Sequence, residues 1–137
     1  MILHTENINN KVKSGLYIVS TPIGNLSDIT LRALEVLKKS DIILCEDTRR
    51  SLKLLNHYKI KKKLVSYHKF NEQKELQKIT EHLNEGKILS LISDTGTTTL
   101  SYPGLLLIKT CIAKNIEVFP IPGSSAITAA VSVSGFN

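Results

Sequence analysis

Short runs of β-branched and aliphatic residues alternate with helix-forming stretches along most of the chain, and this alternation restricts the fold more than any other feature. In the helical stretches the apolar residues recur at helical spacing, as Leu31, Leu34 and Leu37 do. A helix between two strands returns the chain so that both strands run the same way. We therefore predict an α/β fold with a mostly parallel five-stranded sheet flanked by helices on both faces. The predicted strands are 16–20, 42–45, 64–67, 88–92 and 117–120, and the predicted helices are 28–39, 50–57, 72–85, one ending near 115 and one from 122 to about 133.

Local signals set the ends of two helices. Ser27 and Asp28 are residue types that begin helices, so we expect the first helix to open there. Gly86 follows the helix predicted for 72–85, and glycine is the usual residue just beyond a helix end.

The length and composition suit one intracellular domain. The chain has 137 residues, 42% of them hydrophobic, which is enough for a core. We expect residues 1–14 to form a polar flexible tail and residues 15–137 to form the domain. Cys45 and Cys111 lie in apolar runs and are expected to be buried thiols. No apolar stretch reaches membrane-spanning length, so we expect a soluble, cytoplasmic protein without a membrane partner.

The excess positive charge lies in one segment. Between Arg49 and Lys69 there are eight cations and no acidic residue, whereas the residues before and after this segment each carry five cations and six acids. This distribution favours a polyanionic partner. Lys61, Lys62 and Lys63 precede a predicted strand, so we expect them at the sheet edge opposite to Arg49 and Lys69.

Parallel strands bring the loops that follow them to one edge, where α/β proteins bind ligands. The first of these loops contains Pro22 and Gly24 but matches neither the dinucleotide fingerprint nor the P-loop. The second reads Glu46-Asp47-Thr48-Arg49. Its carboxylates suit acid/base chemistry beside an orienting arginine, or alternatively Asp47 or Thr48 merely caps the next helix.

Two later loops exclude several enzyme classes. Asp94-Thr95-Gly96 is shared with aspartic proteases, which need a second such aspartate and an all-β fold. Gly123-Ser124-Ser125-Ala126 lacks the second glycine of a serine-hydrolase elbow. The four histidines and two cysteines have no metal-ligand spacing, so we predict no metal site.

Five motifs occur in order along the chain: residues 16–26, Glu46-Asp47-Thr48-Arg49, Ser66-Tyr67-His68, Ser93-Asp94-Thr95-Gly96-Thr97 and residues 120–126. Taken together, these motifs resemble one family, the ribosomal RNA small-subunit methyltransferase I family of the tetrapyrrole-methylase superfamily. The resemblance covers about residues 15–137. It implies an N-terminal domain of the tetrapyrrole-methylase fold and transfer of a methyl group from S-adenosyl-L-methionine to the 2′-hydroxyl of a cytidine in 16S ribosomal RNA of the small ribosomal subunit. A homodimer is compatible with it.

The resemblance assigns roles to particular residues. The Glu46–Arg49 and His68 loops are expected to face the RNA ribose, with Asp47 or Glu46 as base or orienting group, Arg49 as phosphate clamp and His68 as an alternative base. The expected cofactor contacts are Pro22, Ile23 and Gly24 in the first loop, Asp94, Thr95, Gly96 and Thr97 in the fourth, and Ser125 and Ala126 at the last helix.

This chain departs from the family pattern in two respects. Thr95, Thr98 and Tyr102 replace the alanine, proline and aspartate usual in the fourth loop. Family members also carry a second domain of similar size that closes the cofactor cleft, and it is absent from this chain. We therefore expect weak cofactor binding and no activity by the chain alone. Two alternatives stay open: a domain that binds RNA or a partner without catalysis, and a tetrapyrrole methylase.

Overall fold

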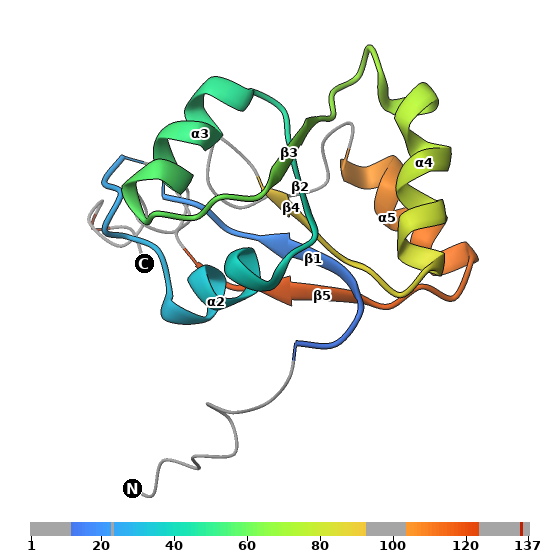
Figure 1. The fold of residues 1–137 in the computed structure, drawn as a ribbon, viewed down its shortest axis with the longest axis horizontal. Coiled ribbons are helices and arrows are strands. Elements are labelled where there is room, and N and C mark those ends of the chain that lie inside the picture. Colours follow the sequence, from blue (N-terminus) through green and yellow to red (C-terminus); the bar gives the residue numbers. More distant parts are fainter. Residues whose placement is uncertain (1–11, 23, 93–103, 124–134, 136–137) are drawn as a thin grey trace, which may run out of the picture.

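The computed structural model describes residues 12–22, 24–92, 104–123 and 135, which build one five-stranded sheet with helices on both faces (Figure 1). The predicted α/β class is confirmed. The strands are β1 (Gly15–Val19), β2 (Ile42–Cys45), β3 (Lys63–Ser66), β4 (Ile88–Ile92) and β5 (Val118–Ile121). The described helices, with the labels of Figure 1, are α2 (Leu31–Lys39), α3 (Thr48–His57), α4 (Glu72–Asn84) and α5 (Gly104–Ala113).

The sheet does not follow the order of the sequence. Its strands are arranged β3-β2-β4-β1-β5, and every neighbouring pair is parallel. β4 therefore lies between β2 and β1. The strands β2 and β4 are buried almost throughout, which explains why both read as continuous apolar runs and not as alternating patterns.

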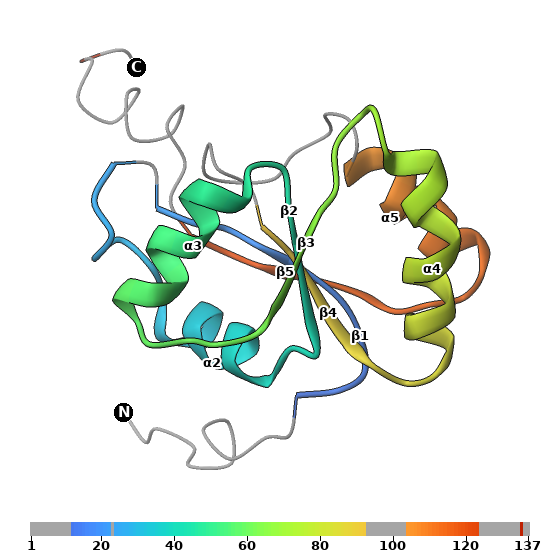
Figure 2. The same cartoon turned by 45° about the horizontal axis from the view of Figure 1, so that its top comes forward.

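Two hydrophobic clusters, one on each face, hold the layers together. Val36 and Leu37 of α2 and Leu55 of α3 pack with strand residues on one face. Ile79 of α4 and Leu107 of α5 pack with strand residues on the other. Figures 1 and 2 show the same division, with α2 and α3 on one side of the sheet and α4 and α5 on the other. Among the described residues two helices cover each face, so the prediction of helices on both faces is confirmed.

The prediction that Ser27 and Asp28 open the first helix is wrong. Asn25 closes a turn instead, because its side chain accepts a hydrogen bond from the N–H of Ser27 at 2.9 Å and its carbonyl accepts one from Asp28 at 3.0 Å. The helix begins at Leu31, where the Thr30 hydroxyl caps it by accepting the N–H of Ala33 at 3.0 Å.

The predicted end of α4 at Gly86 is confirmed. Gly86 has φ of +84°, and its N–H donates to the Leu83 carbonyl at 3.1 Å. The N–H of Lys87 donates to the His82 carbonyl at 3.2 Å, which completes a Schellman motif. Elsewhere β2 and β4 have the predicted bounds and the other three strands shift by one residue, whereas α3 begins at Thr48, two residues before the predicted start at 50.

Both cysteines are buried thiols, as predicted. Cys111 lies on α5 in the second cluster, and burial raises the pKa of its thiol from 9.0 to about 11. Between pH 9 and about 11 the Cys111 thiol therefore stays neutral in the folded protein, whereas it ionises in the unfolded chain.

This pKa shift predicts an alkaline loss of stability. The contribution of the neutral thiol is fully present below pH 9 and is lost as the pH rises from 9 to about 11. At about 1.4 kcal/mol per pH unit, roughly 2–3 kcal/mol of unfolding free energy disappears across this window. Urea unfolding between pH 8 and pH 11 should therefore show a shallower slope against pH for Cys111→Ala than for the wild type. Equal slopes would contradict the prediction.

Candidate functional site

The carboxyl ends of all five strands lie at one level of the sheet. Val19, which ends β1, is paired with Ile92 of β4 and with Ile121 of β5. Ile92 is paired with Cys45 of β2, and Cys45 with Ser66 of β3. The chain therefore leaves every strand at the same edge. This is the edge at which the sequence places the candidate residues.

The strand order divides these exits into two groups. The exits of β4, β1 and β5 are adjacent, and those of β3 and β2 are adjacent beside them. Neighbouring strands are about 4.8 Å apart. All residues expected to contact the cofactor follow β4, β1 or β5, and all those expected to face RNA follow β2 or β3. The strands that precede the expected cofactor residues are thus adjacent in the sheet, although β2 and β3 separate them along the sequence.

The adjacent strands β1 and β4 form a topological switch point. β1 leads through α2 to β2 on one side of this strand pair, and β4 leads through α5 to β5 on the other. Because α2 and α5 cover opposite faces, the chain leaves the two strands in opposite directions (Figure 2). Open α/β sheets bind ligands in the crevice at such a point.

The loop after β1 is packed tightly against the end of β5. Ser20 and Thr21 are buried, and Ser20 donates its N–H to the carbonyl of Ile121 at 3.3 Å. A Cβ atom on Gly123 would lie 2.7 Å from the Ser20 Cβ, so only glycine fits there. Around Gly24, by contrast, no atom of the described residues other than its chain neighbours lies within 4 Å of an added Cβ.

Of the expected cofactor residues, Pro22 and Gly24 are described, Pro22 half-buried and Gly24 exposed. Outside the described residues lie Ile23, Asp94, Thr95, Gly96, Thr97, Ser125 and Ala126, together with Thr98 and Tyr102 and the helix predicted from 122.

The loop after β2 supplies an acidic and a basic side chain at the start of a helix. Glu46, Asp47 and Arg49 are all exposed. The Asp47 carboxylate accepts the N–H of Arg49 at 2.9 Å and caps α3, so the capping interpretation is correct for Asp47. A carboxylate has about four acceptor positions, so a capping aspartate retains capacity for a substrate hydroxyl.

The loop after β3 forms a tight turn. The side chain of Asn71 accepts the N–H of His68 at 2.8 Å and donates to the carbonyl of Ser66 at 2.8 Å. The N–H of Phe70 donates to Nδ1 of His68 at 3.2 Å. The lone pair on Nδ1 is thereby occupied, and a neutral His68 ring carries its proton on Nε2. In this geometry His68 offers a hydrogen-bond donor, which favours the carboxylates over His68 as the base.

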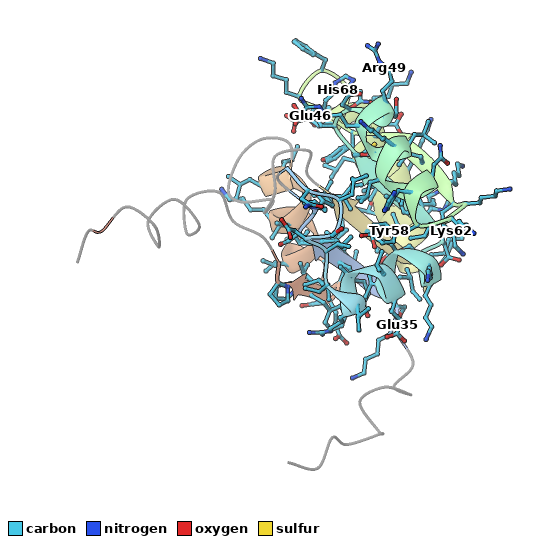
Figure 3. All side chains as sticks on the ribbon, turned by 90° about the vertical axis from the view of Figure 1, so that its left-hand side faces the viewer. Glu35, Glu46, Arg49, Tyr58, Lys62 and His68 are labelled. Carbon is cyan, nitrogen blue, oxygen red and sulfur yellow. The ribbon has the colours of Figure 1, made fainter. Side chains whose placement is uncertain are left out.

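Figure 3 shows Glu46, Arg49 and His68 at the same end of the molecule. Lys62 lies away from them and next to Tyr58 in this view, as expected from its position before β3. The basic segment is therefore divided between the two edges of the sheet, as the sequence predicts.

Two side chains near this edge, to which the sequence assigns no role, each carry a buried polar atom. The Tyr67 hydroxyl and Oε2 of Glu72 have no hydrogen-bond partner among the described residues, although both residues are buried. Burial raises the pKa of Tyr67, and the Glu72 carboxylate raises it further. No sequence signal predicts this pair, because the burial of a side chain depends on packing between elements that are distant in sequence, as for Tyr67 in the second cluster.

The sequence profile of the family described as "Tetrapyrrole (Corrin/Porphyrin) Methylases" matches residues 15–137. The chain belongs to the tetrapyrrole methylase family. Curated relatives named "Ribosomal RNA small subunit methyltransferase I" include one from Mesomycoplasma conjunctivae, 58% identical over 87% of this chain and 50% of the relative. Another, from Thermotoga maritima, is 51% identical over 88% of this chain and 54% of the relative. The resemblance identified from sequence is confirmed, and the chain spans about half the length of these relatives.

Solved structures of tetrapyrrole methylases share the fold. Uroporphyrin-III-C-methyltransferase from Thermus thermophilus superposes with a TM-score of 0.64 at 20% identity, over 87% of this chain and 52% of that one. A cobalt precorrin-4 methyltransferase superposes with a TM-score of 0.66 at 19% identity, over 85% of this chain and 48% of that one. Within the described residues, no helix is both long and apolar enough to cross a membrane.

Tetrapyrrole methylases generally use S-adenosylmethionine, and the described part of the site fits such a ligand. The switch point lies between β1 and β4, the buried hydroxyl residues Ser20 and Thr21 line the exit of β1, and Gly24 leaves room for close approach. Small residues and backbone groups are what a polar cofactor requires at such an edge.

Proposed function

We propose that this chain is part of a cytoplasmic enzyme that methylates the 2′-hydroxyl of a cytidine in 16S ribosomal RNA, using S-adenosylmethionine and acting on the small ribosomal subunit. The names of the curated relatives support ribosomal RNA as substrate. The observation that supports the proposal is the strand order. The strands β4, β1 and β5, whose loops would bind the cofactor, end side by side, and this part of the edge is called the cofactor half. The strands β3 and β2, whose loops would face RNA, end beside them and form the RNA half.

The cofactor half would be formed by Pro22, Ile23 and Gly24, by Asp94, Thr95, Gly96 and Thr97, and by Ser125 and Ala126. When bound, S-adenosylmethionine supplies an electrophilic methyl group. The residues of this half bind and orient the cofactor. The tight contact of Gly123 with Ser20 fixes the loop after β1 relative to β5.

The RNA half supplies the proton acceptor and the side chains that bind the substrate. Asp47, or Glu46 beside it, takes the proton of the ribose 2′-hydroxyl, which makes the oxygen a better nucleophile. Arg49 holds a phosphate oxygen, and His68 donates from Nε2 to an acceptor on the nucleotide. The adjacency of β2 and β4 brings this acceptor beside the cofactor half.

The charge arrangement on α3 supports an anionic substrate. Cations are favourable at helix C-termini and acids at N-termini. α2 follows this rule with Lys38 and Lys39 in its last turn, and α4 with acids in its first turn. α3 carries Arg49 and Arg50 just after its acidic cap Asp47, and like α2 it has no acid within its first turn. Two cations there add to the positive end of the helix dipole and favour a bound phosphate.

The substitution Arg49→Ala tests this role. We expect stability to be unchanged or slightly raised, because a cation is removed from the positive end of α3 and alanine favours the helix. RNA affinity should fall by about tenfold, and the slope of log affinity against log salt should decrease by about one. Thermal unfolding and titration of labelled RNA at several salt concentrations measure the two effects. Lys62→Ala, at the opposite edge, is the control and should change RNA affinity less.

The function itself is tested by methyl incorporation. The natural gene product that contains this chain is incubated with labelled S-adenosylmethionine and either small ribosomal subunits or a porphyrinoid. Label in 16S RNA that maps to a cytidine ribose supports the proposal. Label in the porphyrinoid alone would identify a tetrapyrrole methylase, and RNA binding without label would identify a binding domain.

A further inference from the structure

Phe70 is an aromatic ring presented to solvent at the edge where RNA is proposed to bind. Its exposed fraction is 84%. It follows His68 and Lys69 in the turn between β3 and α4, at the carboxyl edge of the sheet. Single exposed apolar residues are common on proteins, so exposure alone does not indicate a role. The surroundings of this ring distinguish it.

The turn that carries Phe70 is held by several hydrogen bonds. The Phe70 N–H donates to His68 Nδ1, the Asn71 side chain joins His68 to Ser66, and the Asn71 N–H donates to the His68 carbonyl at 3.1 Å. The His68 and Phe70 rings meet edge to face with centroids 5.9 Å apart. The backbone that presents the ring is therefore fixed before any ligand binds, which lowers the entropy cost of binding.

A cation lies against the ring. The Lys69 ammonium lies 5.0 Å from the centroid of Phe70. Arg49 and Glu46 lie at the same end of the molecule as His68 (Figure 3), and the segment from position 49 to position 69 contains eight cations and no acidic residue. Other exposed large apolar side chains, Leu31, Leu52 and Ile112, are aliphatic and lie on helices. An exposed aromatic ring among cations is the arrangement with which proteins bind unpaired nucleotides.

We propose that Phe70 is a stacking platform for an unpaired base of the RNA substrate, with Lys69 and Arg49 neutralising the neighbouring phosphates. This inference rests on the proposed function, because it assumes that RNA reaches the exits of β2 and β3. It adds a specific requirement, namely that the nucleotide seated there is not base-paired. Stacking positions the strand without reading its sequence, since every base has an aromatic face.

The test is binding of a fluorescein-labelled single-stranded RNA of twelve nucleotides, followed by anisotropy, to the natural protein and its variants. We expect Phe70→Ala and Phe70→Leu each to lower affinity about tenfold, and Phe70→Trp to retain it, because stacking contributes about 1–3 kcal/mol per base. Ile112→Ala, an exposed apolar residue on α5, is the matched control and should change nothing. Lys69→Ala should reduce the salt dependence, whereas Phe70→Ala should leave it unchanged.

The outcomes separate this proposal from the proposed function. If Phe70→Leu binds RNA like the wild type while methyl transfer to 16S RNA is intact, stacking is wrong and the function stands. If Phe70→Ala changes the sedimentation of the protein but not its RNA affinity, the ring contacts protein, and the proposal is also overturned. If the wild type binds no RNA, both the platform and the RNA half of the site are wrong.

Discussion

Asp47→Asn should reduce methyl transfer by about 10²–10⁴-fold while leaving the fold intact, because general-base catalysis contributes about that much. Asparagine caps helices as well as aspartate does, and its side-chain oxygen can accept the Arg49 N–H as the Asp47 carboxylate does at 2.9 Å. The substitution therefore removes the proton acceptor and keeps the cap. The measurement is methyl incorporation into small ribosomal subunits by the natural gene product, together with thermal unfolding.

Two companion variants complete the test. Asp47→Ala removes both roles and should cost about 1 kcal/mol of stability in addition to the activity. Glu46→Gln, on the adjacent exposed carboxylate, decides which of the two side chains takes the proton. Binding of S-adenosylmethionine should be the same in all three. If Asp47→Asn retains full activity, the aspartate is only a cap, and the base must be sought in Glu46.

Gly123→Ala should disrupt the cofactor half of the site. The new Cβ would meet the Cβ of Ser20 at 2.7 Å and its carbonyl oxygen at 3.3 Å, so the exits of β1 and β5 must move apart. Overpacking of this kind costs about 1–3 kcal/mol, and we expect the affinity for S-adenosylmethionine to fall by at least about tenfold. Thermal unfolding and calorimetry measure the two effects. Adding Ser20→Gly removes the clashing atom and should restore part of both.

Gly24→Ala is the matched control for that variant. Apart from its chain neighbours, the described part of the chain places no atom within 4 Å of the added Cβ, and no left-handed backbone is required, so stability should not change. If the turn contacts the cofactor as proposed, affinity nevertheless falls, and the loss cannot be attributed to misfolding. Unchanged affinity in Gly24→Ala would remove Gly24 from the site.

The local parts of the fold were predictable because their causes are local. The five strands follow from short apolar runs, and the end of α4 follows from Gly86, whose positive φ completes the Schellman motif. The start of α2 was not predictable in this way. Ser27 and Asp28 have the right composition for a cap, but Asn25 closes a turn first, and Thr30 takes the capping role.

The sequence predicted which loops carry the candidate residues, but it did not predict the hydrogen bonds and the burial of the side chains around them. Glu46, Asp47 and Arg49 follow β2 and reach the ligand edge as expected. The sequence left open whether Asp47 caps α3, and the structure shows that it does. The hydrogen bond from the Phe70 N–H to Nδ1 of His68 depends on how the turn folds back on itself. The buried Tyr67 hydroxyl and Glu72 carboxylate had no signal at all, because burial is decided by elements distant in sequence.

The α/β class, the parallel direction of the strands and the edge at which their loops meet were predictable from the chain alone, because periodicity and connection type are local properties of the sequence. The order β3-β2-β4-β1-β5 was not predictable in this way. A helical connection fixes strand direction but leaves open on which side of the growing sheet the next strand is added. That choice depends on which faces pack together, here α2 with α3 and α4 with α5. The resulting order gathers the proposed cofactor loops into one half of the edge and the proposed RNA loops into the other.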